Sequence, residues 1–229
     1  MGRGRTRNMK TLIRIPLALF ILGAARPDDP PELLSEDFEK GADRWEFSDP
    51  DAWKTADGPT GKMLSLHKKT QPKTPHRSPF GVALLKDLVL GDFVLEARAQ
   101  SSIKDYPHRD LCLFFGYQDA AHFYYSHLGK KTDDHANQIF IVNGADRKKI
   151  STKTTEGTNW TDGWHTVKVV RKAAEGTIEV YWDDLKTPAQ TAVDKTFAWG
   201  RVGLGSFDDL GNFDDVKLRG VKGVPPDRK

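Results

Sequence analysis

Several features are scarce in this sequence, and their scarcity excludes whole classes of protein. Cys112 is the single cysteine among 229 residues, so an intramolecular disulfide and a multi-cysteine zinc site are both excluded. The 20 glycines and 13 prolines are too few for collagen or for a low-complexity linker. Hydrophobic residues nevertheless make up 38% of the chain, which is enough to bury a core. We therefore expect one folded domain with a short terminal segment.

Acidic residues are missing from the first 25 positions, and this explains the basic composition. The formal net charge is +3 for the whole chain. Residues 1–25 carry five of the cations, which are Arg3, Arg5, Arg7, Lys10 and Arg14. Residues 26–229 therefore carry a charge of −2, which is +3 less these five. Such a body offers no electrostatic basis for binding a phosphate backbone, and we expect no nucleic-acid partner.

The first 25 residues have the pattern of a signal peptide. A basic stretch precedes an apolar run at 15–25, which is shorter than the span of about 20 residues that crosses a membrane. Gly23 and Ala25 are small residues at the positions expected before a cleavage site. We expect a secreted or periplasmic protein with no integral membrane segment after cleavage, although an uncleaved amphipathic anchor is the alternative. A linker rich in proline and acidic residues follows at 26–33, then the domain at 34–220 and a frayed tail at 221–229.

The body of the chain is organised as short apolar runs separated by turn residues. Residues 91–101 alternate strictly, with Phe93, Leu95, Ala97 and Ala99 on one side. Further runs of four to eight residues, rich in β-branched and aromatic side chains, predict strands within 111–119, 122–129, 138–144, 165–172, 176–184, 199–209 and 212–220. A hairpin is expected to turn at 173–176.

One segment, 81–90, has spacing that fits either a helix or strands. Val82, Leu85 and Val89 recur with helical period, but glycines at 81 and 91 bracket the segment closely. We favour two short strands around residues 86–87. Many short strands at this spacing predict an all-β fold, a two-sheet antiparallel sandwich of the jelly-roll type.

The common catalytic motifs are absent. Jelly-roll glycosidases place two carboxylates on one strand face as E-x-D-x-x-E or E-x-D-x-E, and this sequence contains neither. It also lacks G-x-S-x-G, H-E-x-x-H, the P-loop and G-x-G-x-x-G. The sequence therefore argues against the common classes of hydrolase.

Three stretches carry a resemblance to a known fold. They are residues 92–101 leading into 109–128, residues 164–184 and residues 200–218. In this order they resemble the concanavalin-like, laminin-G-like jelly roll, and in particular a bacterial secreted family of 3-keto-disaccharide hydrolase-like proteins, formerly a domain of unknown function. The resemblance covers about residues 38–218. It implies a groove that binds saccharide, and Gly116 stands where that family usually carries an arginine facing the groove.

The tyrosine-rich segment at 122–128 supplies the candidate binding face. Alternation puts Phe123, Tyr125 and His127 on one side, which the resemblance makes the ligand-facing side. On the preceding strand that side would carry Asp110, Cys112, Phe114 and Gly116, with the glycine leaving room for a ligand. The ligand-binding candidates are Arg109, Asp110, Phe114, Tyr125, His127 and Asn137. The simpler alternative is a solvated sheet with cross-strand pairs and a local ion pair among His108, Arg109 and Asp110. We expect Cys112 to be buried and inert.

Two functions besides saccharide binding stay open. In a hydrolase of the 3-keto-disaccharide type, His127 or His135 would act as general base or acid, and Arg147 or Arg109 would stabilise developing negative charge. The third alternative is a laminin-G-like structural or protein-interaction module. A metal site at His108, His127 and His135 matches no known ligand spacing.

An acidic segment and two tryptophans complete the candidates. Asp208, Asp209, Asp214 and Asp215 lie within eight residues around a glycine turn and could hold a structural calcium ion, which is the one cofactor we consider. By resemblance, Glu36 or Asp37 would contribute where the first and last strands meet. The alternative is a solvated acidic turn. Trp53 and Trp160 lie in loop-like sequence and are candidates for stacking on sugar rings.

Overall fold

The computed structural model describes residues 30–225, and these residues form β-strands with one short 3₁₀ helix. The expected signal peptide at 1–25, most of the linker and the end of the tail lie outside the described residues. No helix of the described part is long and apolar enough to cross a membrane. The elements are β1 (Glu32–Glu36), β2 (Trp45–Phe47), η1 (Pro50–Ala52), β3 (Trp53–Asp57), β4 (Lys62–Leu66), β5 (Gly81–Leu85), β6 (Leu90–Ser101), β7 (Cys112–Asp119), β8 (His122–His127), β9 (Gln138–Asn143), β10 (Lys148–Lys149), β11 (Ser151–Thr154), β12 (His165–Lys172), β13 (Thr177–Trp182), β14 (Gln190–Val193), β15 (Arg201–Ser206) and β16 (Gly211–Lys222).

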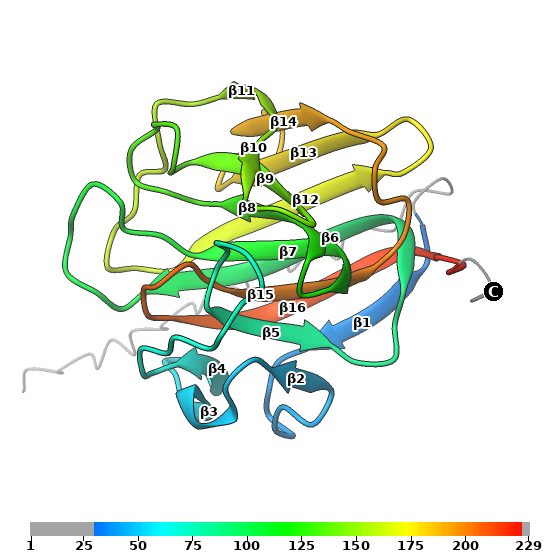
Figure 1. Cartoon of the computed structure of the whole chain (residues 1–229). Helices are drawn as coiled ribbons and strands as arrows, with labels where there is room; N and C mark the ends of the chain where they lie inside the picture. Colours follow the sequence, from blue (N-terminus) through cyan, green and yellow to red (C-terminus); the bar gives the residue numbers. More distant parts are fainter. Residues whose placement is uncertain (1–29, 226–229) are drawn as a thin grey trace, which may run out of the picture.

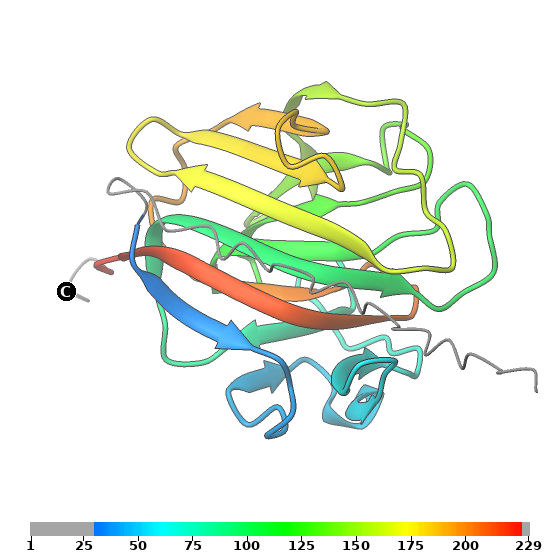
Figure 2. The same cartoon turned by 180° about the vertical axis from the view of Figure 1, so that it is seen from behind.

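The strands form two antiparallel sheets packed face to face. The nine-stranded sheet has the order β11-β14-β13-β12-β6-β16-β4-β3, with β1 paired to β16. The seven-stranded sheet has the order β10-β9-β8-β7-β15-β5-β2. Figure 1 views the molecule from the side of the seven-stranded sheet, and Figure 2 views it from the side of the nine-stranded sheet. The expected two-sheet jelly-roll sandwich is confirmed.

The hydrophobic core lies between the two sheets, as strand alternation requires. Leu95 and Ala97 of β6 and Val167 and Val169 of β12 point inward from one sheet and are fully buried. Leu113 and Phe115 of β7, Ile139 of β9 and Leu204 of β15 meet them from the other sheet. Burial of these side chains, at roughly 1.5–3 kcal/mol each, is the main term that holds the sheets together.

The expected strands are confirmed except the second of the two short strands within 81–90, and the structure adds others. Residues 81–101 form β5 and β6 on either side of a short connection, not a helix. The short strands β1–β4, β10, β11 and β14 were not expected from the sequence. The domain limits are also wider than 34–220: β1 begins at Glu32, and β16 continues to Lys222, which pairs with Leu90. Backbone pairing therefore orders the first two residues of the segment expected to fray.

The outward face of the seven-stranded sheet carries a second apolar cluster, called the outer cluster below. Its members are Val82, Leu84, Cys112, Phe114, Phe123, Tyr125, Phe140 and Val142. The loop at residues 67–80 crosses in front of this face, as Figure 1 shows in teal. The backbone N–H of Phe80 donates to the carbonyl of Phe207 at 3.0 Å, which ties the end of the loop to the β15–β16 connection. This covered face is where the candidate site residues lie.

Candidate functional site

Tyr125 and Phe114 lie in the outer cluster, but neither is open to a ligand. Both side chains have 0% exposed surface. Tyr125 stacks on Phe140 with ring centroids 5.1 Å apart and an interplanar angle of 17°. Burial raises the pKa of the Tyr125 hydroxyl well above its usual value. The expected concave groove over these two residues is therefore filled by side chains, which corrects the picture of an open aromatic plate.

Arg147 covers Tyr125 from the loop that follows β9. Its Cζ atom lies 4.6 Å from the ring centroid of Phe140 and 4.3 Å from that of Phe207. Its Nη1 group donates a 2.8 Å hydrogen bond to the Tyr125 hydroxyl. The guanidinium thus lies between two aromatic rings, a favourable cation–π arrangement. Alternation alone could not place this residue, because Arg147 belongs to a connection and not to a strand.

The buried end of the same face is polar. His127 at the end of β8 is 4% exposed, and its Nε2 atom lies 3.7 Å from Oδ2 of the fully buried Asp110. The Nδ1 atom of His127 accepts the backbone N–H of Asn137 at 3.4 Å. Burial, with a further contribution from the charge of Arg147, lowers the pKa of His127 to about 3. The imidazole is therefore neutral at pH 7, and Cys112 beside it is buried as expected.

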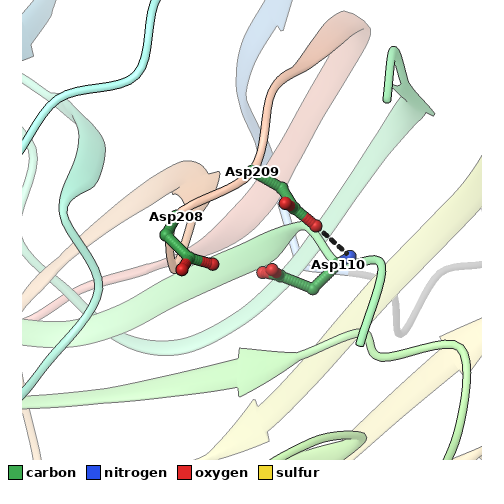
Figure 3. Close-up of side chains that lie close together, drawn as sticks. All are labelled: Asp110, Asp208 and Asp209. Atoms are coloured by element: carbon green, nitrogen blue, oxygen red, sulfur yellow. Dashed lines mark hydrogen bonds between the residues drawn. The ribbon is translucent and has the colours of Figure 1, made fainter. Parts of the chain in front are cut away.

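Three carboxylates meet at this polar end, as Figure 3 shows. One oxygen from each of Asp110, Asp208 and Asp209 lies within 4.8 Å of the other two. Asp110 precedes β7, whereas the other two lie on the β15–β16 connection. The Asp110 backbone N–H donates to Oδ2 of Asp209 at 3.0 Å, and the Tyr106 hydroxyl donates to the same oxygen at 2.8 Å. We call these three residues the acidic cluster.

Two members of the acidic cluster have raised pKa values. The pKa of Asp110 is raised to about 6, chiefly by burial and partly by the charge of Asp208. The pKa of Asp209 is raised to about 7, by burial and by the charge of Asp110. Hydrogen bonds from the Phe207 N–H at 3.1 Å and the Ser206 hydroxyl at 3.3 Å limit the shift at Asp110. Two buried carboxyl groups this close do not both ionise easily.

The four aspartates expected to form one calcium site do not group together. Asp214 and Asp215 lie within β16 and line a separate hollow with Asp37 and Glu39. Arg98 enters that hollow, and its Nη1 atom lies 3.3 Å from Oδ2 of Asp215. Asp37 is there as the resemblance implied. The group that converges instead includes Asp110, which the sequence had suggested only as a ligand contact.

Arg109, Asn137 and His135 lie away from the outer cluster, contrary to expectation. Arg109 is 1% exposed. Its side chain donates to the Ser101 hydroxyl at 3.0 Å and to Asp162 at 3.1 Å, and not to Asp110. Asn137 is fully buried and accepts a 2.8 Å hydrogen bond from Gln190 of the other sheet. His135 is exposed in the loop before β9, and it is not part of the acidic cluster. The hydrogen-bond partners of the Arg109 side chain are thus Ser101 and Asp162, whereas the Asp110 carboxylate accepts the Phe207 N–H of the β15–β16 connection.

Gly116 and the two loop tryptophans also have structural roles. Gly116 has φ +56° at an irregularity in the pairing of β7, and a Cβ atom there would lie 3.0 Å from Cδ2 of Tyr124, which belongs to the core. The glycine therefore accommodates a turn of the backbone and does not open space for a ligand. Trp53 and Trp160 are each 5% exposed, and the Trp160 indole donates to the Leu128 carbonyl at 2.7 Å. Neither tryptophan is available for stacking on a sugar.

A hollow of about 230 Å³ lies between the 67–80 loop and the outward face of the seven-stranded sheet. We call it the loop hollow. Its lining includes Lys73, Thr74, Phe80, Tyr117, Phe123 and Arg201. Tyr117 is half-buried and stacks on Phe123 with centroids 5.0 Å apart, and the Cζ atom of Arg201 lies 5.6 Å from the Tyr117 ring. Sequence reasoning missed this hollow because the loop has no strand pattern, although its run of lysine, histidine and proline residues is unusual.

No family model and no curated protein matches this sequence. Solved structures do match the fold. A carbohydrate-binding module, CBM66 from Bacillus subtilis, aligns with TM-score 0.54 and 20% identity over 77% of this chain and 96% of its own. Domain 4 of AbnA, an extracellular GH43 arabinanase from Geobacillus stearothermophilus solved with arabinotriose, aligns with TM-score 0.54 and 12% identity, over 86% of this chain and 96% of its own.

A lectin domain aligns as well. The exoplasmic/lumenal domain of VIP36, in its Ca²⁺/Man3GlcNAc-bound form, has TM-score 0.51 and 14% identity over 84% of this chain and 90% of its own. At these identities the likeness shows the fold alone. This chain has the jelly-roll sandwich of carbohydrate-binding modules and lectins. Membership of the 3-keto-disaccharide hydrolase-like family stays a prediction.

Proposed function

We propose that this domain binds a saccharide in the loop hollow, on the outward face of the seven-stranded sheet. The observation that carries the proposal is the half-buried Tyr117 ring, presented beside charged groups in a hollow of about 230 Å³. Pockets for drug-sized ligands run to about 300–1,000 Å³, so this hollow suits one or two sugar rings of a longer chain. The signal-peptide pattern at residues 1–25 supports action outside the cytoplasm.

The lining of the loop hollow matches the chemistry of a sugar ring. The exposed part of the Tyr117 ring, which Phe123 supports from beneath, suits the C–H face of a sugar ring, and polar groups at the border suit its hydroxyls. Arg201 is held against Tyr117 by an ion pair with Glu46, whose oxygen lies 2.5 Å from Nη1. This pair offers a fixed donor and a fixed acceptor side by side. The structural neighbours include proteins solved with arabinotriose and with Man3GlcNAc, which supports a saccharide over other small ligands.

The test is calorimetry of the purified full-length chain against a panel of polysaccharides, with product followed by chromatography in the same samples. Tyr117→Ala should weaken binding by about 10-fold or more, since the loss of one stacking aromatic is worth about 1.4 kcal/mol or more. Tyr181→Ala, which removes a tyrosine from the nine-stranded sheet, is the matched control and should leave the affinity unchanged. Equal affinities for the two variants would refute the loop hollow as the site. If no glycan of a broad panel binds, the laminin-G-like interaction module becomes the better proposal.

The alternative is a glycoside hydrolase acting at the acidic cluster, and the raised pKa values of Asp110 and Asp209 favour it. A carboxyl group with a pKa of about 6 or 7 can act as general acid near neutral pH. In the hydrolase alternative these carboxyls would replace the proposed histidines, because His127 has a pKa of about 3 and His135 is exposed and is not part of the cluster. Product from any glycan, including a 3-keto-glycoside, that is lost in Asp209→Asn would establish this function.

We further propose that the acidic cluster, not the four-aspartate set expected from sequence, holds a calcium ion. Three carboxylates are ligands that Ca²⁺ prefers, and each retains at least one oxygen without a hydrogen bond among the described residues. A divalent cation would also offset the negative charge that, after burial, contributes to the raised pKa values of Asp110 and Asp209. Saturation at 100 times the dissociation constant would raise the free energy of unfolding by about 2.7 kcal/mol. The thermal midpoint should therefore rise with Ca²⁺ and not with Mg²⁺, and this rise should be lost in Asp208→Asn.

A further inference from the structure

The loop that covers the loop hollow is strongly basic. Residues 67–80 contain Lys68, Lys69, Lys73 and Arg77 together with two histidines, and they contain no acidic residue. All four cations are exposed, and none forms a salt bridge in the described part of the chain. Residues 26–229 as a whole carry −2, so this concentration of positive charge does not follow from the overall composition. An isolated basic surface on an acidic body attracts anions.

The second half of the basic loop is tied to neighbouring connections, and Lys73 of this loop lines the hollow. The Arg77 backbone N–H donates to Asp146 at 2.8 Å, and the Arg77 carbonyl accepts the Arg147 N–H at 3.2 Å. The rings of Phe80 and Phe207 pack with centroids 5.6 Å apart. These contacts anchor the second half of the loop to the connections after β9 and β15. A ligand that enters the hollow therefore meets a loop whose backbone is anchored at Arg77 and whose Phe80 ring is packed.

Two guanidinium groups border the same aromatic ring. The Cζ atoms of Arg147 and Arg77 lie 4.3 and 6.0 Å from the centroid of Phe207. Arg147 has five N–H donors, and its side chain makes one hydrogen bond among the described residues, to Tyr125. Neither Asp146 nor Asp208 forms a salt bridge with either arginine in the part of the chain described. Arginine forks of this kind match carboxylate and sulfate oxygens.

We infer that the saccharide bound in the loop hollow is acidic and carries carboxylate or sulfate groups. A sugar ring lies against Tyr117, and its anionic substituents contact Lys73 at the lining of the hollow and Arg77 beside it. This inference rests on the proposed saccharide binding and adds the chemical class of the ligand. A neutral glycan would leave the cations of the loop without a role in recognition.

The test compares matched ligands on the full-length chain by calorimetry. Polygalacturonate is compared with its methyl ester, and dextran sulfate with dextran, at about 50 mM and about 500 mM NaCl, since salt screens exposed charges. The acidic member of at least one pair should bind about 10-fold more tightly at low salt, and this preference should shrink at high salt. The pair that shows the preference identifies the anion as carboxylate or sulfate.

A charge-removing variant locates the effect. Lys73→Gln/Arg77→Gln should reduce the preference for the acidic ligand over its neutral partner by about 5–10-fold, because each exposed cation contributes about 2–5-fold to the affinity for an anion. Lys217→Gln/Arg219→Gln, on β16 of the other sheet, removes the same charge and should have no effect. Equal binding of acidic and neutral glycans would overturn the inference while leaving saccharide binding intact. An RNA oligonucleotide that bound as tightly as the acidic glycans would also overturn the inference of an acidic saccharide. If no glycan binds, the proposed saccharide binding itself is refuted.

Discussion

Replacement of Phe114 by alanine tests whether the outward face of the seven-stranded sheet is packed as a second core or stands open as a groove. Phe114 is 0% exposed and lies among Phe123, Tyr125 and Cys112 in the outer cluster. Its ring centroid is 6.0 Å from those of both Phe123 and Tyr125. In an open groove the same side chain would contact water or ligand, and its removal would cost little stability.

The packed arrangement predicts a large loss. Truncation of a buried phenylalanine costs about 3–5 kcal/mol, which includes the cavity that remains. For a domain of about 200 residues each kcal/mol lowers the thermal midpoint by about 2–4 °C, so the midpoint should fall by about 6–20 °C.

Urea denaturation and calorimetry measure the change directly. Phe115→Ala is the matched control, because Phe115 is the next residue of β7, is also 0% exposed and points into the core between the sheets. The two variants should lose similar stability. The reasoning is refuted if Phe114→Ala lowers the free energy of unfolding by less than about 1 kcal/mol while Phe115→Ala lowers it by about 3–5 kcal/mol. The outward face would then be open, and Tyr125 would again be a candidate for direct contact with a ligand.

Two other predictions test the backbone of β7 and the acidic cluster. Gly116→Ala should destabilise the domain by about 1–2 kcal/mol or more in urea denaturation. The reason is that φ is +56° at this position and the new Cβ would lie too close to the Tyr124 ring. An unchanged free energy of unfolding would mean that the backbone relaxes freely there. The pKa of Asp209, raised to about 7, lies above its value of about 3.9 in an unfolded chain, so the folded protein holds the extra proton between these limits. Asp209 therefore makes the free energy of unfolding fall as pH rises from about 4 to about 7. In Asp209→Asn this contribution should be lost, so that the urea midpoint depends less on pH over this range. An unchanged dependence on pH would mean that the pKa of Asp209 is not raised in the folded protein.

The strands and the class of fold could be predicted because their signals are local. In β6, alternating apolar residues mark the buried face, and turn residues such as Asn143 and Gly144 mark the ends of strands. The same alternation correctly separated Phe123 and Tyr125 from Tyr124. It could not say that another part of the chain would cover the outward face. For this reason residues on the correct face were expected to be open and proved to be buried.

The candidate site depended on contacts between distant parts of the chain. Asp110 accepts a hydrogen bond from the Phe207 N–H across 97 positions because β7 pairs with β15, with Cys112 opposite Gly205. No spacing in the sequence connects Asp110 to Asp208. Asp214 and Asp215 are close to Asp208 in the sequence, but they lie in β16 and line a separate hollow. The short strands β1–β4 were missed because their few residues carry little periodic signal.

The sequence by itself determined the period of the strands, the places of the turns, the two-sheet class of fold and the unusual charge of residues 67–80, because each depends on neighbouring residues or on composition. The tertiary structure alone decided which apolar face is covered, which carboxylates meet and where the basic loop lies. Those outcomes follow from sheet register and long-range packing, which bring together residues that no local pattern connects.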